Sequence, residues 1–324
     1  MGLNKEQVKE IVDLFKKYKN CADKIAPQLC PRRNNENSDF DYDEDRPNNR
    51  KVKDLLVYMA GKDKPLDDWK LQSISSIEVQ IYVGLFNKFD PWFDYSGLLN
   101  YDEVKNVVKA LTLEEDVKKQ LVDEIRKIFK VLMKDSAEDS LIFTTSETMS
   151  APYFLMAFLK VKPKGRGLNK HHVQELIHFH KNNKINGDQI DPVAISKFIK
   201  KLSLVQEEHE DVLVFDSRRK TPFQLQELLL VLAEYNKGAS EENGPVYSTD
   251  SVRDLLLHFS NYDVDKNGLL SKEELKKIQE PRYQIEDVDT TFKELDTEDD
   301  EHLYITEFFM AVFVERDRKN AIKD

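Results

Sequence analysis

Six residues near the carboxyl end have the types and the spacing that bind a calcium ion. Residues 263–274 read DVDKNGLLSKEE, which fits the calcium-loop pattern D-x-[DN]-x-[DN]-G, five residues, then Glu, without a mismatch. Oxygens that alternate along a curling backbone converge on one hard cation, and a carboxylate at the twelfth position closes the shell with both its oxygens. The predicted ligands, one of them a backbone carbonyl, are Asp263, Asp265, Asn267, Leu269, Ser271 and Glu274.

The sequence on both sides of this loop predicts the helices that position it. Apolar residues recur with helical spacing before the loop, at Val252, Leu255, Leu256 and Phe259. Ser271 and Glu274 have the spacing of a helix-start capping box, which leads into a helix with Leu275 and Ile278. The helix, the loop and the second helix together resemble an EF-hand, the helix–loop–helix unit of a calcium-binding superfamily.

A second acidic loop opens at Asp296, close enough in sequence to pair with the first. Its apolar eighth position is Leu303, where paired loops form a short β-ladder, and Glu301 stands where the pattern has glycine. We therefore expect a strained backbone at Glu301 without the loss of a ligand oxygen. The alternative is a loop that only supports its neighbour. The predicted ligands are Asp296, Glu298, Asp300, His302 and Glu307.

A third loop, which opens at Asp90, is less regular. Its closing carboxylate stands fourteenth rather than twelfth, and an insertion of two residues around Pro91 and Trp92 would account for this spacing. The resemblance to EF-hands allows such a longer loop to bind an ion. The candidate ligands are Asp90, Asp94, Ser96 and Glu103.

Other loops are expected to bind no ion. The loop from Asp216 carries Arg218 and Lys220 at two ligand positions, where cations repel calcium. We interpret the acidic run from Asp43 as a solvated loop. The loops near Asp135 and Asn182 lack a twelfth carboxylate, because Ser146 and Ala194 would stand there.

Histidine and cysteine give weaker signals. Four histidines lie within ten residues, at His171, His172, His178 and His180. Zinc sites need closer pairing and a further carboxylate or thiolate, so we interpret them as a polar helix face. The two cysteines, Cys21 and Cys30, are expected to be reduced thiols, with a regulatory disulfide as the alternative.

The two halves of the chain repeat one another. Four ordered matches flank residues 161–167, a stretch with glycine and proline: GLNK at 2 and 167, an apolar helix at 52 and 225, the loops from Asp90 and Asp263, and an aromatic helix at 154 and 308. The domains predicted from these matches are residues 1–160 and 168–324, joined by a linker. The resemblance implies an all-α fold of repeated EF-hand units in two tandem, calmodulin-like domains, most of whose loops have degenerated. Only short β-ladders would join paired loops.

Composition limits the function. Charged residues make up 34% of the 324 residues and the net charge is −11, which suits cation binding and argues against nucleic acid as a partner. We expect no membrane span, because no apolar run approaches 18 residues. The first residues lack the apolar core of a secretory signal, which predicts a cytoplasmic protein. Phosphate-binding, nucleophile-elbow and zinc-protease motifs are absent from the sequence, so we expect no enzyme.

These features favour a calcium sensor or adaptor. Calcium would change the arrangement of the helices and open an apolar groove to a protein partner. The alternatives are a calcium buffer with one working pair of loops, which binds without opening, and a constitutive helical scaffold.

Overall fold

The computed structural model describes residues 3–18, 25, 48–61, 73–90, 96–139, 148–187, 189–215, 223–236, 246–296 and 300–321, and they are mainly helical. The all-α prediction is confirmed. The chain divides into two compact units. Unit 1 contains residues 1–63, 72–163 and 196–221, and unit 2 contains residues 64–71, 164–195 and 222–324. The chain leaves unit 1 within the predicted linker 161–167, and residues 196–221 return to it. The division into two duplicated domains stays a prediction.

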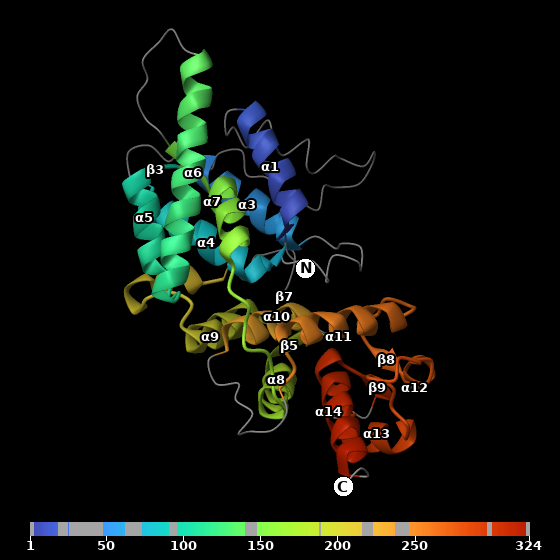
Figure 1. The fold of residues 1–324 in the computed structure, drawn as a ribbon. Coiled ribbons are helices and arrows are strands. Elements are labelled where there is room, and N and C mark those ends of the chain that lie inside the picture. Colours follow the sequence, from blue (N-terminus) through green and yellow to red (C-terminus); the bar gives the residue numbers. More distant parts are fainter. Residues whose placement is uncertain are drawn as a thin grey trace, which may run out of the picture. The chain divides into compact units, whose positions relative to one another are not determined.

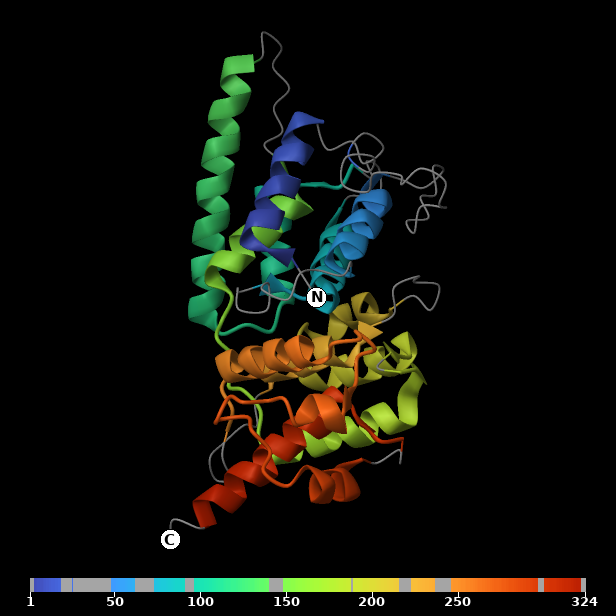
Figure 2. The same ribbon diagram turned by 90° about the vertical axis from the view of Figure 1, so that its right-hand side faces the viewer.

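Unit 1 consists of helices and two short antiparallel ladders, β1–β2 and β3–β4 (Figure 1). Its elements in chain order are β1 (Leu3–Asn4), α1 (Lys5–Lys17), α3 (Asn48–Gly61), β2 (Ser73–Ile74), α4 (Ser76–Phe89), β3 (Leu98–Asn100), α5 (Tyr101–Ala110), α6 (Glu115–Asp139), β4 (Thr148–Ser150) and α7 (Ala151–Val161). The 3₁₀ helix η2 (Glu207–Leu213) completes the unit. Both views show the long α6 projecting beyond the other helices of this unit (Figures 1 and 2).

Unit 2 also consists of helices and short antiparallel strands. Its elements are α8 (Lys170–Asn183), β5 (Lys184–Asn186), β6 (Gln189–Ile190), β7 (Phe223–Gln224), α10 (Leu225–Tyr235), α11 (Thr249–Tyr262), β8 (Leu270–Ser271), α12 (Lys272–Leu275), α13 (Val288–Leu295), β9 (His302–Leu303) and α14 (Ile305–Ala321). β5, β6 and β7 form one antiparallel sheet, and β8 pairs with β9. The boundary between the units falls within α9 (Pro192–Leu202).

Several of the short strands, and one isolated β-bridge, lead directly into a helix with a side-chain cap. A polar residue at the end of the strand or just after it accepts a hydrogen bond from the first turn of the helix, and a side chain three residues later bonds back to the cap backbone. This reciprocal box is formed at Asn4, Ser75, Asn100, Asn169 and Ser271. The cap fixes the residue at which each helix begins. Because the cap lies at or next to a paired strand, the strand pairing also fixes the start of the helix that follows.

The segments that match in sequence also match in local structure. Leu3 pairs with Ile74, and Leu168 forms an antiparallel bridge with Tyr247. Gly167, just before that bridge, has φ +84°, and a Cβ there would lie 1.9 Å from the Tyr247 carbonyl oxygen, so only glycine fits. In both places the leucine is followed by a capping asparagine and a helix.

α4 is the central helix of unit 1. Every residue from Ser76 to Phe86 is buried, and α4 contacts α3, α5, α7 and η2. The sequence accounts for this position, because α4 is apolar around nearly its whole circumference. The Tyr82 ring packs on Phe158 with centroids 4.5 Å apart, and Phe154 and Phe158 of α7 are buried core residues, as their helical spacing predicts.

Unit 1 contains a buried ion pair between α4 and the residue that follows α7. The Lys162 ammonium lies 2.7 Å from a Glu78 carboxylate oxygen, and the two side chains are 1% and 0% exposed. Lys162 also donates to the Ser73 carbonyl, and Glu78 accepts the Ser75 N–H of the capping box. These hydrogen bonds compensate part of the cost of removing two charges from water.

The core of unit 2 is built on α14. This helix contacts α8, α10, α11 and α13, and its Phe308, Phe309 and Phe313 side chains are fully buried. The Phe308 ring lies 5.8 Å from the ring of Phe259 on α11. The apolar face predicted for the helix before the first loop, which includes Phe259, thus packs on α14. Among the described helices of both units, none is long and apolar enough to cross a membrane.

Candidate metal centre

The loop between α11 and α12 gathers three carboxylates. Asp263, Asp265 and Glu274 each offer an oxygen, and these oxygens lie within 4.8 Å of one another. Oxygens bound to one calcium ion at 2.3–2.6 Å are at most about 5 Å apart, so the group is compact enough for a single ion. No second group of this kind occurs in the part of the chain that the structure describes. The donor set, all oxygen, fits calcium.

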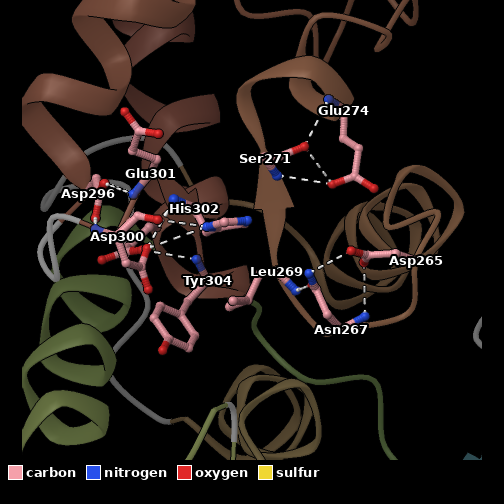
Figure 3. A network of polar contacts seen from close by, with 11 residues as sticks. Asp265, Asn267, Leu269, Ser271, Glu274, Asp296, Asp300, Glu301, His302 and Tyr304 are labelled. Carbon is pink, nitrogen blue, oxygen red and sulfur yellow. Dashed lines mark hydrogen bonds and ion pairs between the residues drawn. The ribbon is translucent and has the colours of Figure 1, made fainter.

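Backbone hydrogen bonds hold this loop in its curled shape. Asp263 directly follows α11 and is 5% exposed, and its two carboxylate oxygens accept the N–H groups of Asn267 at 3.1 Å and Gly268 at 3.0 Å. Asn267 in turn accepts the N–H of Leu269 at 2.8 Å through its Oδ1 (Figure 3). Gly268 has φ +81°, the left-handed turn that the pattern predicts.

Glu274 closes the loop from α12. Its Oε1 accepts the Val264 N–H at 2.8 Å. Its Oε2 accepts the N–H and the hydroxyl of Ser271 at 3.0 and 2.9 Å (Figure 3). Asp263 and Glu274 are therefore at opposite ends of the loop in sequence, but their carboxylate oxygens lie close together in space. Ser271, predicted to bind the ion directly or through water, uses its hydroxyl on Glu274 and on the cap of α12.

The electrostatics of this loop favour a bound cation. Burial raises the pKa of Asp263, and the hydrogen-bonded Asp265 raises it further, although the Gly268 N–H opposes the change. Burial also opposes the ionisation of Glu274, but the N–H groups of Ser271 and Val264 outweigh it and lower its pKa. A divalent cation would compensate the burial of these carboxylates, since it interacts only with their charged forms.

Two features of the loop were not predicted. Lys266 has φ +60°, and nothing in its residue type signals a left-handed backbone. The exiting helix was expected to include Ile278, but α12 ends at Leu275. Pro281 limits a helix here only from Glu280 onward, so it does not account for an end at Leu275.

The last loop has the same hydrogen-bond pattern. Asp296 accepts the N–H groups of Asp300 at 3.3 Å and Glu301 at 2.8 Å, and Glu307 accepts the Tyr304 N–H at 2.9 Å. Asp300 accepts the His302 N–H at 3.0 Å, and the His302 ring contacts the Asp300 carbonyl (Figure 3). Glu298 lies outside the described residues.

Glu301 adopts φ +62°, the conformation that glycine has in the first loop. The expected strain at this position is therefore present. The loop keeps its shape despite the missing glycine because its ends are fixed, at Asp296 by α13 and at Glu307 by α14.

The two loops are joined by the β8–β9 ladder. Leu270 pairs with Leu303, and Ser271 pairs with His302. Both leucines are fully buried. The predicted pairing of the loops through their apolar eighth positions is confirmed.

The loop from Asp90 is only partly described. Gly97 has φ +74° and donates its N–H to Asp90 at 3.0 Å, as Gly268 does to Asp263. Gly97 follows its aspartate by seven residues where Gly268 follows by five, which agrees with an insertion of two residues. Ser96 accepts the Leu98 N–H, Glu103 accepts the Asn100 N–H in a capping box, and Asp94 lies outside the described residues.

The remaining loops stay largely predictions. Asp43, Asp216, Arg218, Lys220 and Ser146 lie outside the described residues, as do both cysteines, and the side chain of Asp135 is not described. The Asn182 side chain donates to the His178 carbonyl of its own helix. Ala194 is buried within α9 and offers no carboxylate.

The histidines of α8 do not form one polar face. His172 and His180 are buried, and they contact the Asn169 N–H and the Gly187 carbonyl respectively. The correction has a simple cause, because helical spacing places both of them toward the interior. His171 and His178 are paired with Glu175 and Asn182 along the helix surface.

The comparison with protein families agrees with the chemistry of the first loop. Residues 206–311 match the family model described as the Ca binding region of secreted protein acidic and rich in cysteine. This part of the chain is a calcium-binding region. The match includes α11, both acidic loops of unit 2 and the β8–β9 ladder, and the calcium prediction is confirmed. Searches of curated proteins and of solved structures gave no match.

Proposed function

We propose that the chain is an EF-hand protein in which the loops at residues 263–274 and 296–307 bind calcium as a pair. The observation that carries the proposal is the compact group of Asp263, Asp265 and Glu274 in a loop of matching sequence. The equivalent hydrogen bonds of the last loop and the ladder between the loops support a second site.

We further propose that this pair acts as a sensor rather than as an enzyme. The helices on either side of the two loops bury apolar side chains, among them Leu255, Leu256, Phe259, Leu275 and Phe308. A change in the angle between α11 and α12 would uncover part of this set, and an apolar groove of this kind binds an amphipathic partner helix. The partner class is therefore protein, and nucleic acid is not proposed.

The alternative of a buffer differs in one measurable property. A buffer binds calcium with little change of its helices, so it exposes no new apolar surface. Fluorescence of an apolar dye should rise when calcium is added to a sensor and should stay constant with a buffer or with a constitutive scaffold.

The affinity of the site bears on the cellular compartment. Sensors of the cytoplasm bind calcium at about 10⁻⁷–10⁻⁵ M, whereas extracellular modules bind at about 10⁻⁴–10⁻³ M. We propose a cytoplasmic location, and this proposal requires an affinity in the first range. Millimolar affinity would favour the extracellular setting that the name of the matching family suggests.

Calorimetric titration of the metal-free full chain tests the binding proposal. We expect about two ions to bind, and Glu274→Gln to lose the tighter one because it removes the carboxylate that closes the loop. Glu273→Gln is the matched control, since the neighbouring Glu273 is exposed and outside the pattern. Binding that is unchanged by Glu274→Gln, or absent at millimolar calcium, would contradict the proposal.

A further inference from the structure

A segment that arrives from the second half of the chain covers one face of α4. After residues 164–195, which belong to unit 2, the chain returns to unit 1 with residues 196–221. Within this stretch, residues 204–215 make the contacts described below, and we call them the covering segment. Because α4 is buried from Ser76 to Phe86 and is mostly apolar, the face that the segment covers requires a mainly apolar occupant.

The covering segment begins as an added strand. Val205 forms an antiparallel bridge with Leu111, in the connection between α5 and α6. The Thr112 N–H donates to the Leu204 carbonyl at 3.1 Å, and the Gln206 N–H donates to the Ala110 carbonyl at 2.9 Å. Pairing of an extended segment with exposed backbone groups is a common way in which proteins bind peptides.

The second half of the covering segment carries three buried apolar side chains, of which Val212 lies against α4. Val212, Leu213 and Phe215 are 8%, 0% and 2% exposed. Val212 lies against Gly84, where an added Cβ would come within 3.2 Å of the valine Cβ. The lack of a side chain at Gly84 thus makes room for the aliphatic anchor.

A lysine at the carboxyl end of α4 forms an ion pair with the covering segment. The Lys88 ammonium contacts an Asp211 carboxylate oxygen at 2.5 Å and the Glu208 carbonyl at 3.1 Å. The Phe89 ring meets the His209 ring edge-on, with centroids 5.3 Å apart. Lys88 and Asp211 are 29% and 65% exposed, so the pair confers selectivity more than stability.

We propose that this face of α4, with the α5–α6 connection, is a peptide-binding surface that the covering segment occupies in competition with a partner. The partner is a protein segment of the same chemistry. It has an extended stretch that pairs with residues 110–112, then a carboxylate for Lys88 followed by aliphatic, aliphatic, any residue and aromatic, as in DVLVF at 211–215. The surface does not require calcium at the loops of unit 2.

The buried side chains and the Phe215 N–H, which donates to Ser196 Oγ at 3.0 Å, hold the segment, but its polar contacts with α4 and the α5–α6 connection are weak enough to allow such competition. The ladder has two backbone hydrogen bonds, and the ion pair is half exposed. A tethered segment nevertheless has a high local concentration, which keeps the surface occupied until a partner displaces it.

The test uses the full chain and a labelled synthetic peptide of residues 203–215. Val212→Asp weakens the internal anchor, so we expect the peptide to bind this variant at least tenfold more tightly than the unmodified chain, measured by fluorescence anisotropy. Val214→Asp is the matched control, because Val214 is 67% exposed and its loss should leave the surface occupied. A peptide that itself carries Val212→Asp should not bind.

Charge exchange tests the role of Lys88. Lys88→Glu in the Val212→Asp chain should weaken the unmodified peptide several-fold, and a peptide with Asp211→Lys should recover the loss. If the unmodified peptide binds Val212→Asp no more tightly than the unmodified chain, or if the changed peptides bind equally well, the surface is not a peptide site.

Hydrogen exchange on the unmodified chain gives an answer even if Val212→Asp fails to fold. A displaceable segment opens by itself, so the Gln206 and Thr112 amides should exchange at least tenfold faster than the Val83 amide of α4. Equal rates would mean that the segment opens only when the whole unit unfolds. It would then be ordinary core, and the proposal would fail.

Discussion

Gly97 and Asp90 reproduce, across a longer loop, the contact that Gly268 and Asp263 make in the calcium-binding region. In both loops the glycine N–H lies 3.0 Å from the aspartate carboxylate, and the glycine has a positive φ. The separation in sequence differs, seven residues against five. The turn that closes the loop is therefore kept while the chain before it is extended.

This relationship makes Gly97 sensitive to substitution. Gly97→Ala should destabilise unit 1 by about 1–2 kcal/mol, because a residue with a Cβ resists a left-handed backbone. Urea unfolding followed by circular dichroism measures the change. Gly97→Asn should cost less, since asparagine tolerates this conformation. Equal losses in the two variants would show that the backbone conformation is not the cause.

Glu301 offers the opposite experiment. Glu301→Gly should stabilise unit 2, by up to about 1 kcal/mol, because it removes the strain of φ +62° and loses less than this through the added freedom of the unfolded chain. Glu301→Ala removes the same charge but keeps the strain, so it should bring no gain. Thermal unfolding without calcium compares the variants. A gain with alanine would assign the effect to charge.

Glu124 should make the packing of α6 on α7 sensitive to acid. Hydrogen bonds from Lys127 and Lys160 lower the pKa of this carboxyl below its ordinary value of 4.5. A carboxylate with a lower pKa in the folded state contributes its full stability above the unfolded-state pKa, and the contribution is lost as the pH falls through the folded-state pKa. Glu124→Gln should therefore lose less stability between about pH 5 and pH 3 than the unmodified chain.

The control for this prediction lies on the same helix. Glu115 pairs with Lys118 one turn away, but its side chain is 88% exposed. Glu115→Gln should leave the acid dependence nearly unchanged. Chemical unfolding at a series of pH values would reveal a similar slope in all three proteins if Glu124 were not responsible.

The buried pair of Lys162 and Glu78 predicts a large loss on removal of one charge. Lys162→Met should destabilise unit 1 by about 3–5 kcal/mol, because it leaves the Glu78 carboxylate buried without its cation. Adding Glu78→Gln should recover part of the loss, since glutamine is neutral and can still accept the Ser75 N–H. If the double variant is no more stable than Lys162→Met alone, the unpaired charge is not the source of the loss.

The sequence predicted the parts of the structure that depend on local chemistry. The capping box of Ser271 and Glu274, the pairing of Leu270 with Leu303 and the left-handed backbone at Glu301 all follow from residue type and spacing. Long-range packing was harder to predict. Nothing near Val212 signals that it meets Gly84, and no pattern around Lys162 names Glu78 as its partner, because these contacts join residues far apart in the chain.

The ladder between Leu270 and Leu303 has a consequence for the shape of the binding curve. An ion that orders one of the proposed loops also orders its neighbour through this shared pair of residues, so the second ion meets a loop that has already lost much of its conformational freedom. The two binding events are then positively cooperative, and by linkage each site raises the affinity of the other by the same factor. Saturation would be completed over a narrower range of calcium concentration than two independent loops would need.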